Sequence, residues 1–180
     1  MVGTDTWTVG GNVTGNERWD AFAEIRERRA LCRVVPLMRD PNEVAVFIYR
    51  RERYLLLRRM DPRYWHVVAG GVEPGESFPT AAARELAEET GLTAPVIDLG
   101  IPAPYAIDPA DLSQYAPGVT EVLVHVFAVE AADLWEPVLN EEHDIFRWSS
   151  FDDCLALLHW PEAKDALTEL AARRASTASV

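Results

Sequence analysis

The alternation of apolar and polar positions along the chain predicts six short β-strands. β-Branched and aromatic residues dominate 44–49 (VAVFIY), and an arginine-rich turn leads into the next run as a hairpin. The longest run, 120–130 (TEVLVHVFAVE), is apolar almost throughout, which is typical of a central strand covered on both faces. The predicted strands are residues 44–49, 54–58, 65–69, 93–99, 120–130 and 145–148.

Helical periodicity separates an N-terminal extension from the main domain. Residues 1–16 are rich in Gly, Thr and Asn without periodicity, which predicts a flexible arm. Residues 17–33 carry apolar side chains at helical spacing, which predicts an amphipathic helix. This helix could pack on the sheet or on a second subunit in a homodimer. Residues 34–175 then form a single domain.

Two later helical segments complete the predicted fold. An alanine-rich segment follows Ser77, a suitable N-cap, and stops at Gly91. A C-terminal helix, or a pair broken at Pro161, begins at Ser150. Strands, helix, strands and closing helix in this order predict an α/β fold with a mixed sheet between helices, an α/β/α sandwich.

Composition and charge narrow the class of protein. With 180 residues, 48% hydrophobic and 26% charged, the chain suits a globular domain with its own core. Its net charge of -12 argues against a broad electrostatic contact with duplex nucleic acid. The start of the chain lacks a signal-peptide pattern and no apolar stretch is long enough for a bilayer, so we expect a cytoplasmic protein without a membrane partner. Cys32 and Cys154 lack metal-site spacing.

Glutamates gather on one face of the helix that ends at Gly91. At about 100° per residue, Glu85, Glu88 and Glu89 fall within roughly one 100° arc. The opposite side, expected to pack against the sheet, carries three apolar residues: Ala83, Leu86 and Ala87. Like charges at this spacing repel, and a divalent cation such as Mg²⁺ would explain them because it prefers oxygen ligands. A solvated acidic face is the alternative.

A glycine-rich turn before this helix favours a site over a solvated face. Gly70 and Gly75 permit backbone conformations that a side chain would forbid. Glu76 lies just before the helix. Arg84 lies one turn before Glu88, near enough to pair with and orient a carboxylate.

The spacing of these residues resembles the Nudix box, the signature of the Nudix hydrolases. It reads Gly70, five residues, Glu76, seven residues and then RELAEETGL at 84–92. The resemblance implies a Nudix fold and a hydrolase of phosphoanhydride bonds that uses Mg²⁺, for which Mn²⁺ can substitute. It also implies roles for the matched residues: Glu85 and Glu89 as principal metal ligands, Glu88 as a ligand or the base, Arg84 and Glu76 as supports of that cluster, and Gly70 as the residue that shapes the loop.

Segments outside the box resemble one group within that family, the bacterial dihydroneopterin triphosphate diphosphatases, also described as dATP pyrophosphohydrolases. The similar patches lie between residues 44 and 172, and YAPGVT at 115–120 is the most telling. The resemblance implies a small-molecule substrate, a pterin or nucleoside triphosphate, cleaved with release of pyrophosphate. It also implies a further metal contact before the last strand, for which Glu142 is the nearest match and Glu141 the alternative.

Arginines near the first hairpin are candidates for binding phosphate. Six lie between residues 50 and 63, and most are expected on a solvated surface. Arg58 or Arg59, at the end of a strand, could instead contact a phosphate oxygen of the substrate.

Aromatic residues are candidates for binding a heterocycle. Tyr105 and Tyr115 lie in the long connection that follows the box helix, where either could stack on a ring or pin the loop to the domain. Trp65 precedes the glycine turn and is expected in the core or stacked on substrate. His66 points to the other face of the strand and could hydrogen-bond a ligand.

Other substrates and functions fit the same motif. An oxidised nucleotide, ADP-ribose or a dinucleoside polyphosphate would be alternative substrates. Some Nudix-like folds isomerise isopentenyl diphosphate, which needs a catalytic cysteine, and neither Cys32 nor Cys154 has a suggestive partner in sequence. A non-catalytic nucleotide-binding module would typically lack box glutamates, and here none is missing.

Overall fold

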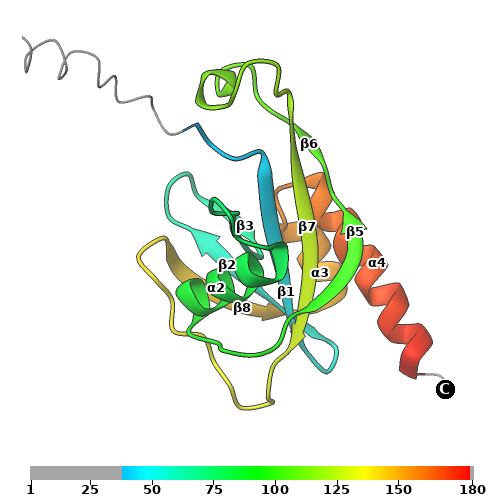
Figure 1. Cartoon of the computed structure of the whole chain (residues 1–180). Coiled ribbons are helices and arrows are strands. Elements are labelled where there is room, and N and C mark those ends of the chain that lie inside the picture. The colour runs from blue at the N-terminus through cyan, green and yellow to red at the C-terminus, as the bar shows by residue number, and fades with distance from the viewer. Residues whose placement is uncertain (1–37, 179–180) are drawn as a thin grey trace, which may run out of the picture. The chain divides into compact units, whose positions relative to one another are not determined.

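The computed structural model of the protein describes residues 38–178 (Figure 1). The predicted arm at 1–16, the predicted helix at 17–33 and Cys32 lie outside the described residues. In chain order the elements are β1 (Asn42–Arg50), β2 (Arg53–Arg59), β3 (Tyr64–His66), β4 (Val68–Gly71), α2 (Phe78–Thr90), β5 (Ile97–Pro102), β6 (Tyr105–Ala106), the 3₁₀ helix η1 (Leu112–Gln114), β7 (Glu121–Glu130), β8 (His143–Ser149), α3 (Phe151–Leu157) and α4 (Pro161–Ala178). None of the helices in this range has both the length and the apolar character of a membrane span.

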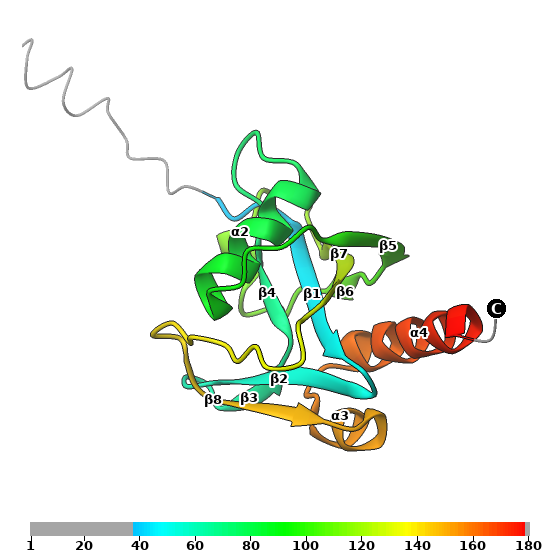
Figure 2. The ribbon, with the colours of Figure 1, turned by 90° about the horizontal axis from the view of Figure 1, so that it is seen from below.

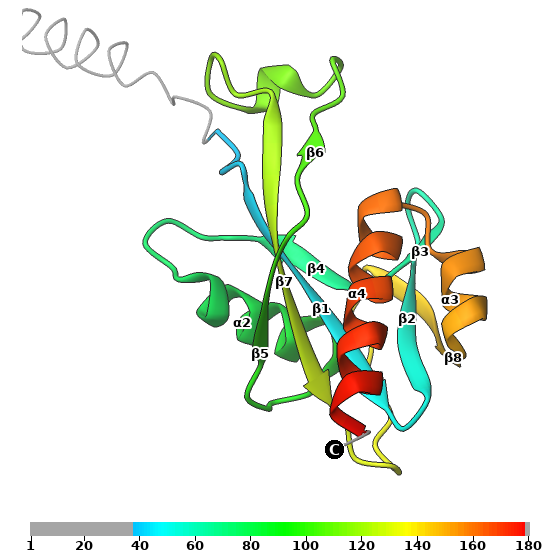
Figure 3. The same ribbon diagram turned by 90° about the vertical axis from the view of Figure 1, so that its right-hand side faces the viewer.

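The strands form the predicted mixed sheet. β1 and β7 run parallel at its centre, and the other strand pairs are antiparallel. The order is β3-β2-β1-β7-β5, with β4 also beside β1, β8 beside β2 and β6 beside β7. β1 and β2 pair at Tyr49–Tyr54 and Arg50–Arg53, next to their turn, and then diverge to different partners (Figure 3). The sheet therefore opens between β4-β1-β7 and β3-β2-β8.

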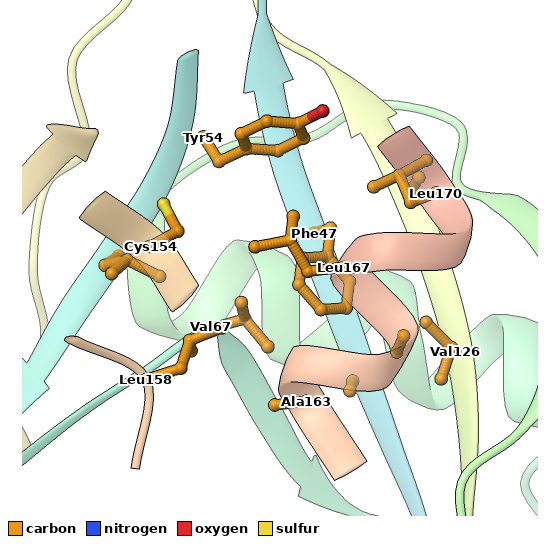
Figure 4. Close-up of a cluster of buried hydrophobic side chains, with 13 residues drawn as sticks. Phe47, Tyr54, Val67, Val126, Cys154, Leu158, Ala163, Leu167 and Leu170 are labelled. Atoms are coloured by element: carbon orange, nitrogen blue, oxygen red, sulfur yellow. The ribbon is translucent and has the colours of Figure 1, made fainter. Parts of the chain in front are cut away.

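Helices cover both faces of the sheet (Figure 2), and an apolar core lies between the helices and the strands on each face. α2 closes one core, in which Leu86 is fully buried. α3 and α4 close the other, where Leu167 and Leu170 pack with strand residues (Figure 4). Along β7, Val126 belongs to the α4 core and Phe127 to the α2 core. This arrangement confirms the α/β/α sandwich and the prediction that the longest strand is covered on both faces.

The caps of α2 are those that local chemistry predicts. The Oγ of Ser77 accepts a hydrogen bond from the N–H of Thr80 at 3.4 Å. At the other end Gly91 adopts a left-handed conformation, with φ of 71°, and its N–H donates to the carbonyl of Ala87 at 2.9 Å.

The buried side of α2 differs from the prediction. Leu86 is buried, but Ala83 and Ala87 are exposed, so the prediction that all three face the sheet is wrong for the two alanines. The buried stripe runs instead through Ala82, Leu86 and Glu89, at the i, i+4, i+7 spacing of one helical face. The glutamates therefore border the buried stripe, and one of them lies within it.

Three strand boundaries also need correction. The predicted strand at 65–69 is two strands, because β3 pairs with β2 while β4 pairs with β1. The strand predicted at 93–99 begins at Ile97, after Pro95, which has no N–H to donate to a sheet. The connection at 101–120 contains β6 and η1.

Candidate active site

The turn from β4 into α2 brings the first box residue against the glutamates. The carboxylate of Glu85 lies directly over Gly70, where a Cβ would come within 2.5 Å of Oε2 and closer still to Oε1 and Cδ. Gly70 lies outside the left-handed region, so it provides space for the carboxylate; the prediction that it serves backbone conformation is wrong. Gly75 does serve that purpose, with φ of 82°.

Arg84 connects the turn to the helix. Its Nε and Nη2 donate to the two carboxylate oxygens of Glu76 at 3.1 and 3.0 Å, and Nη2 also donates to the carbonyl of Gly71 at 2.8 Å. Its Nη1 donates to Glu85 at 2.7 Å and to Glu88 at 3.3 Å. These hydrogen bonds hold the pKa of Glu76 below its usual range and raise the pKa of Arg84. One guanidinium thus positions the turn and two glutamates.

Glu89 is a buried carboxylate that lacks a full set of donors. It is 4% exposed, and its Oε2 has no hydrogen-bond partner among the described residues. Burial, together with the charge of Glu85, raises the pKa of Glu89 to about 9, and burial also raises the pKa of Glu85. The nearest cationic candidate is His143, with Nε2 3.9 Å from Oε2, but burial lowers the pKa of His143 and favours the neutral ring. A divalent cation fits this unpartnered oxygen chemically.

The acidic side chains are not gathered around a single point in this structure. Within residues 38–178, no three His, Cys, Asp or Glu side chains form a group that could hold a metal ion as they stand. Arg84 lies among the box glutamates, and Glu142 pairs with Arg59 at 3.0 Å. The side chains of Glu88 and Glu142 are 57% and 52% exposed, so both lie mainly in solvent.

A cavity of about 660 Å³ lies beside the box, with Glu89 and Gly70 in its lining. Three groups of side chains line it. The first, beside the box, includes Gly70, Arg59, Glu89 and His143; the second is an aromatic group, Tyr64, His66 and Trp160; the third comprises Arg39, Glu43, Tyr105 and Tyr115. Ala163 and Ala166 of α4 close another wall. The cavity is of the size that binds a small organic molecule.

Strand register decides which predicted substrate residues reach the cavity. Arg59 lines it and pairs across the strands with Tyr64, which also lines it. Arg58 pairs with Trp65, and neither lines the cavity. The guanidinium of Arg58 instead donates to Asp144 at 2.9 and 2.7 Å, which lowers the pKa of Asp144, while Trp65 packs against the α4 core. Neighbouring residues of a strand face opposite ways, so of the alternatives left open by the sequence, Arg59 reaches the cavity and Trp65 lies in the core.

Both predicted tyrosines line the cavity and also hold the loop in place. Tyr115 is 4% exposed and packs with Ile107 and Val122. The hydroxyl of Tyr105 donates to Glu43 at 3.1 Å, and burial raises the pKa of Tyr105. The alternatives of stacking and pinning are therefore not exclusive.

Sequence reasoning missed several cavity residues. Tyr64 shares the face of His66 by strand alternation, so a signal existed for it. Trp160, whose ring lies 6.0 Å from that of Tyr64, reaches the cavity because α4 packs against the sheet, and nothing local indicates this. Glu43 and His143 likewise depend on tertiary contacts.

Cys154, the cysteine considered above for other chemistry, and His125 of β7 both pack against other side chains. Cys154 is buried in the α4 core (Figure 4), where burial raises the pKa of its thiol to about 12, and it does not line the cavity. His125 stacks on Phe78, with ring centroids 3.5 Å apart, as expected for a histidine packed within a strand.

Comparison with known proteins shows the family and the fold of this chain. Residues 39–170 match the family model described as NUDIX domain. Over 120 residues the chain is 33% identical to the dihydroneopterin triphosphate diphosphatase of Haemophilus influenzae, a match that covers 62% of this chain and 75% of that protein. The fold resembles the structure of the E. coli dihydroneopterin triphosphate pyrophosphohydrolase, with a TM-score of 0.65 and 30% identity, covering 72% of this chain and 94% of that chain.

One further relative has a different name. Over 98 residues, 53% of this chain, the sequence is 41% identical to a Myxococcus xanthus protein named octanoyltransferase. The match spans 26% of that protein, about a quarter of its length. Its name therefore describes a protein that lies mostly outside the match.

Proposed function

Since this chain belongs to the NUDIX family of hydrolases, we propose that it is a Mg²⁺-dependent pyrophosphohydrolase that cleaves a phosphoanhydride bond of a pterin or nucleoside triphosphate and releases pyrophosphate. The observation that carries the proposal is the buried, unpartnered oxygen of Glu89 beside Glu85, at the wall of a cavity of about 660 Å³. Similarity to two enzymes named for dihydroneopterin triphosphate supports that compound as the first candidate.

Four glutamates would hold the cation: Glu85, Glu88, Glu89 and Glu142. When bound, a divalent cation supplies neutralisation of phosphoryl charge and activation of water. Glu89 is fixed by burial, while the exposed side chains of Glu88 and Glu142 can rotate toward it.

The remaining residues orient these groups and the substrate. Arg84 holds Glu85 and leaves Glu88, which it contacts more weakly at 3.3 Å, as the carboxylate that can accept a proton from the attacking water. Arg59 lines the cavity and can exchange its ion pair with Glu142 for a phosphate oxygen. Gly70 leaves the space that the Glu85 carboxylate fills.

The Glu89→Gln variant tests the proposal. Removing this carboxyl group, which would be ionised when it binds the cation, should lower kcat by about 1,000-fold and abolish Mn²⁺ binding measured by calorimetry. The fold should persist, because a neutral amide costs less to bury than a carboxylate. Glu121→Gln is the matched control, since Glu121 is exposed and does not line the cavity. Wild-type turnover by Glu89→Gln at saturating Mg²⁺ would contradict the assignment.

A substrate panel tests the reaction itself. Dihydroneopterin triphosphate, dATP, an oxidised nucleotide, ADP-ribose and a dinucleoside polyphosphate should be compared with Mg²⁺ and Mn²⁺. Release of pyrophosphate from a triphosphate is the expected result. Exclusive cleavage of ADP-ribose or the dinucleoside compound would replace the proposed substrate class.

A further inference from the structure

Glu43 presents a carboxylate to the cavity, with both oxygens held by side chains from other parts of the chain. Oε2 accepts from the hydroxyl of Tyr105 at 3.1 Å, and Oε1 accepts from Nη2 of Arg39 at 3.2 Å. The side chain is 18% exposed. In the sheet Glu43 lies between Gly71 of β4 and Val124 of β7, so it adjoins the glycine turn.

Two acidic residues of the loop that carries Tyr105 and Tyr115 also line the cavity but are engaged differently. Asp108 accepts from the N–H of Ala110 at 2.8 Å, and Asp111 accepts from the side chain of Gln114 at 2.7 Å. Both are exposed and cap their own loop. Of these three residues, Glu43 is the one whose carboxylate accepts hydrogen bonds from side chains of two separate segments.

The hydrogen-bonding capacity of Glu43 is half used. An ionised carboxylate offers about four acceptor sites, and Tyr105 and Arg39 occupy two. The two that remain suit a ligand with two adjacent N–H donors. A pterin, with its 2-amino and 4-oxo groups, and guanine, with the corresponding 2-amino and 6-oxo groups, both have such an edge, formed by a ring N–H and the neighbouring amino group. We call it the 2-amino-4-oxo edge, after the pterin numbering. Adenine lacks it, because its amino group adjoins a ring nitrogen that is an acceptor.

We propose that Glu43 is a specificity-determining residue that accepts two hydrogen bonds from the 2-amino-4-oxo edge of the substrate ring, with Arg39 and Tyr105 as its positioning residues. The inference rests on the proposed function and deepens it, because it names the ring class that the triphosphate carries. Tyr64 and Trp160 line the same cavity and provide aromatic surface for the ring.

The Glu43→Gln variant tests this inference through substrate preference. Values of kcat/KM are measured for dihydroneopterin triphosphate, GTP and dATP with wild-type protein, Glu43→Gln and the control Glu121→Gln. The preference for each 2-amino-4-oxo compound over dATP should fall roughly 100-fold in Glu43→Gln, because two charge-assisted hydrogen bonds are lost and the new amide directs an N–H at a donor edge. The comparison of the pterin with GTP separates the two sources of this edge. Glu121→Gln should keep the wild-type preference.

Tyr105→Phe provides a second, milder test that does not alter charge. It removes one donor to Glu43 and keeps the ring, so the same preference should fall about fivefold. If Glu43→Gln does not fold, the substrate preference of Tyr105→Phe tests the inference in its place. A preference within threefold of wild type in the folded variants would overturn the inference, and so would an equal loss for all three compounds. Either result leaves the proposed function standing, whereas a wild-type protein inactive on every triphosphate would overturn both.

Discussion

Replacing Gly70 by alanine tests whether space for one carboxylate controls activity. The new Cβ would lie 2.5 Å from Oε2 of Glu85 and closer to Oε1 and Cδ, whereas ordinary contacts between heavy atoms need about 3.5 Å. The carboxylate must therefore move by at least about 1 Å. A displacement of that size at a catalytic centre costs about 100-fold in rate, or about 2.7 kcal/mol of transition-state stabilisation.

The assay compares kcat/KM at saturating Mg²⁺ and Mn²⁺ affinity by calorimetry in Gly70→Ala and Gly71→Ala. Gly71 is the matched control, because a Cβ there would meet no atom within 4 Å and its backbone is not left-handed. We expect both quantities to fall in Gly70→Ala and to stay within about threefold of wild type in Gly71→Ala. Wild-type kcat/KM and Mn²⁺ affinity in a folded Gly70→Ala protein would refute the reasoning.

Two further predictions follow from the orientation of side chains. Arg59→Ala should raise KM for the triphosphate about tenfold, because Arg59 lines the cavity, whereas Arg58→Ala should change KM by less than about threefold; steady-state kinetics would reject this if the order were reversed. Leu86→Ala should lower the free energy of unfolding in urea by about 2–5 kcal/mol, because Leu86 is fully buried, and Ala87→Ser should lower it by less than about 0.5 kcal/mol. Similar losses of unfolding free energy in Leu86→Ala and Ala87→Ser would contradict the assignment of the buried face of α2.

Most of what could be predicted of the fold depends on contacts between residues close in sequence. Ser77 and Gly91 cap α2 through groups no more than four residues away. The division of 65–69 into two strands depends instead on β1 and β2, which offer separate edges to the same short segment. The five residues from Trp65 to Ala69 give no local signal of that change of partner.

The residues of the candidate site also divide into those that local sequence predicts and those that depend on tertiary contacts. The spacing of the box was enough to predict that Glu85 and Arg84 lie near the glycine turn, where Glu85 covers Gly70 and Arg84 donates to the carbonyl of Gly71. Helix periodicity alone did not show which side of α2 is buried, because alanine is compatible with either environment. The choice between Arg58 and Arg59 depended on strand register, and the presence of Trp160 depended on the docking of α4.

The positions of the cavity-lining residues along the chain have a consequence for how ligand preference could change by substitution. The charged groups beside the box are complete once His143 has been made, whereas Trp160, Ala163 and Ala166 are added by the last segment. During synthesis, the charged residues beside the box are therefore present before the residues that line the cavity from α4 and the position just before it. Substitutions in this terminal helix can reshape ligand choice while leaving the chemistry upstream intact.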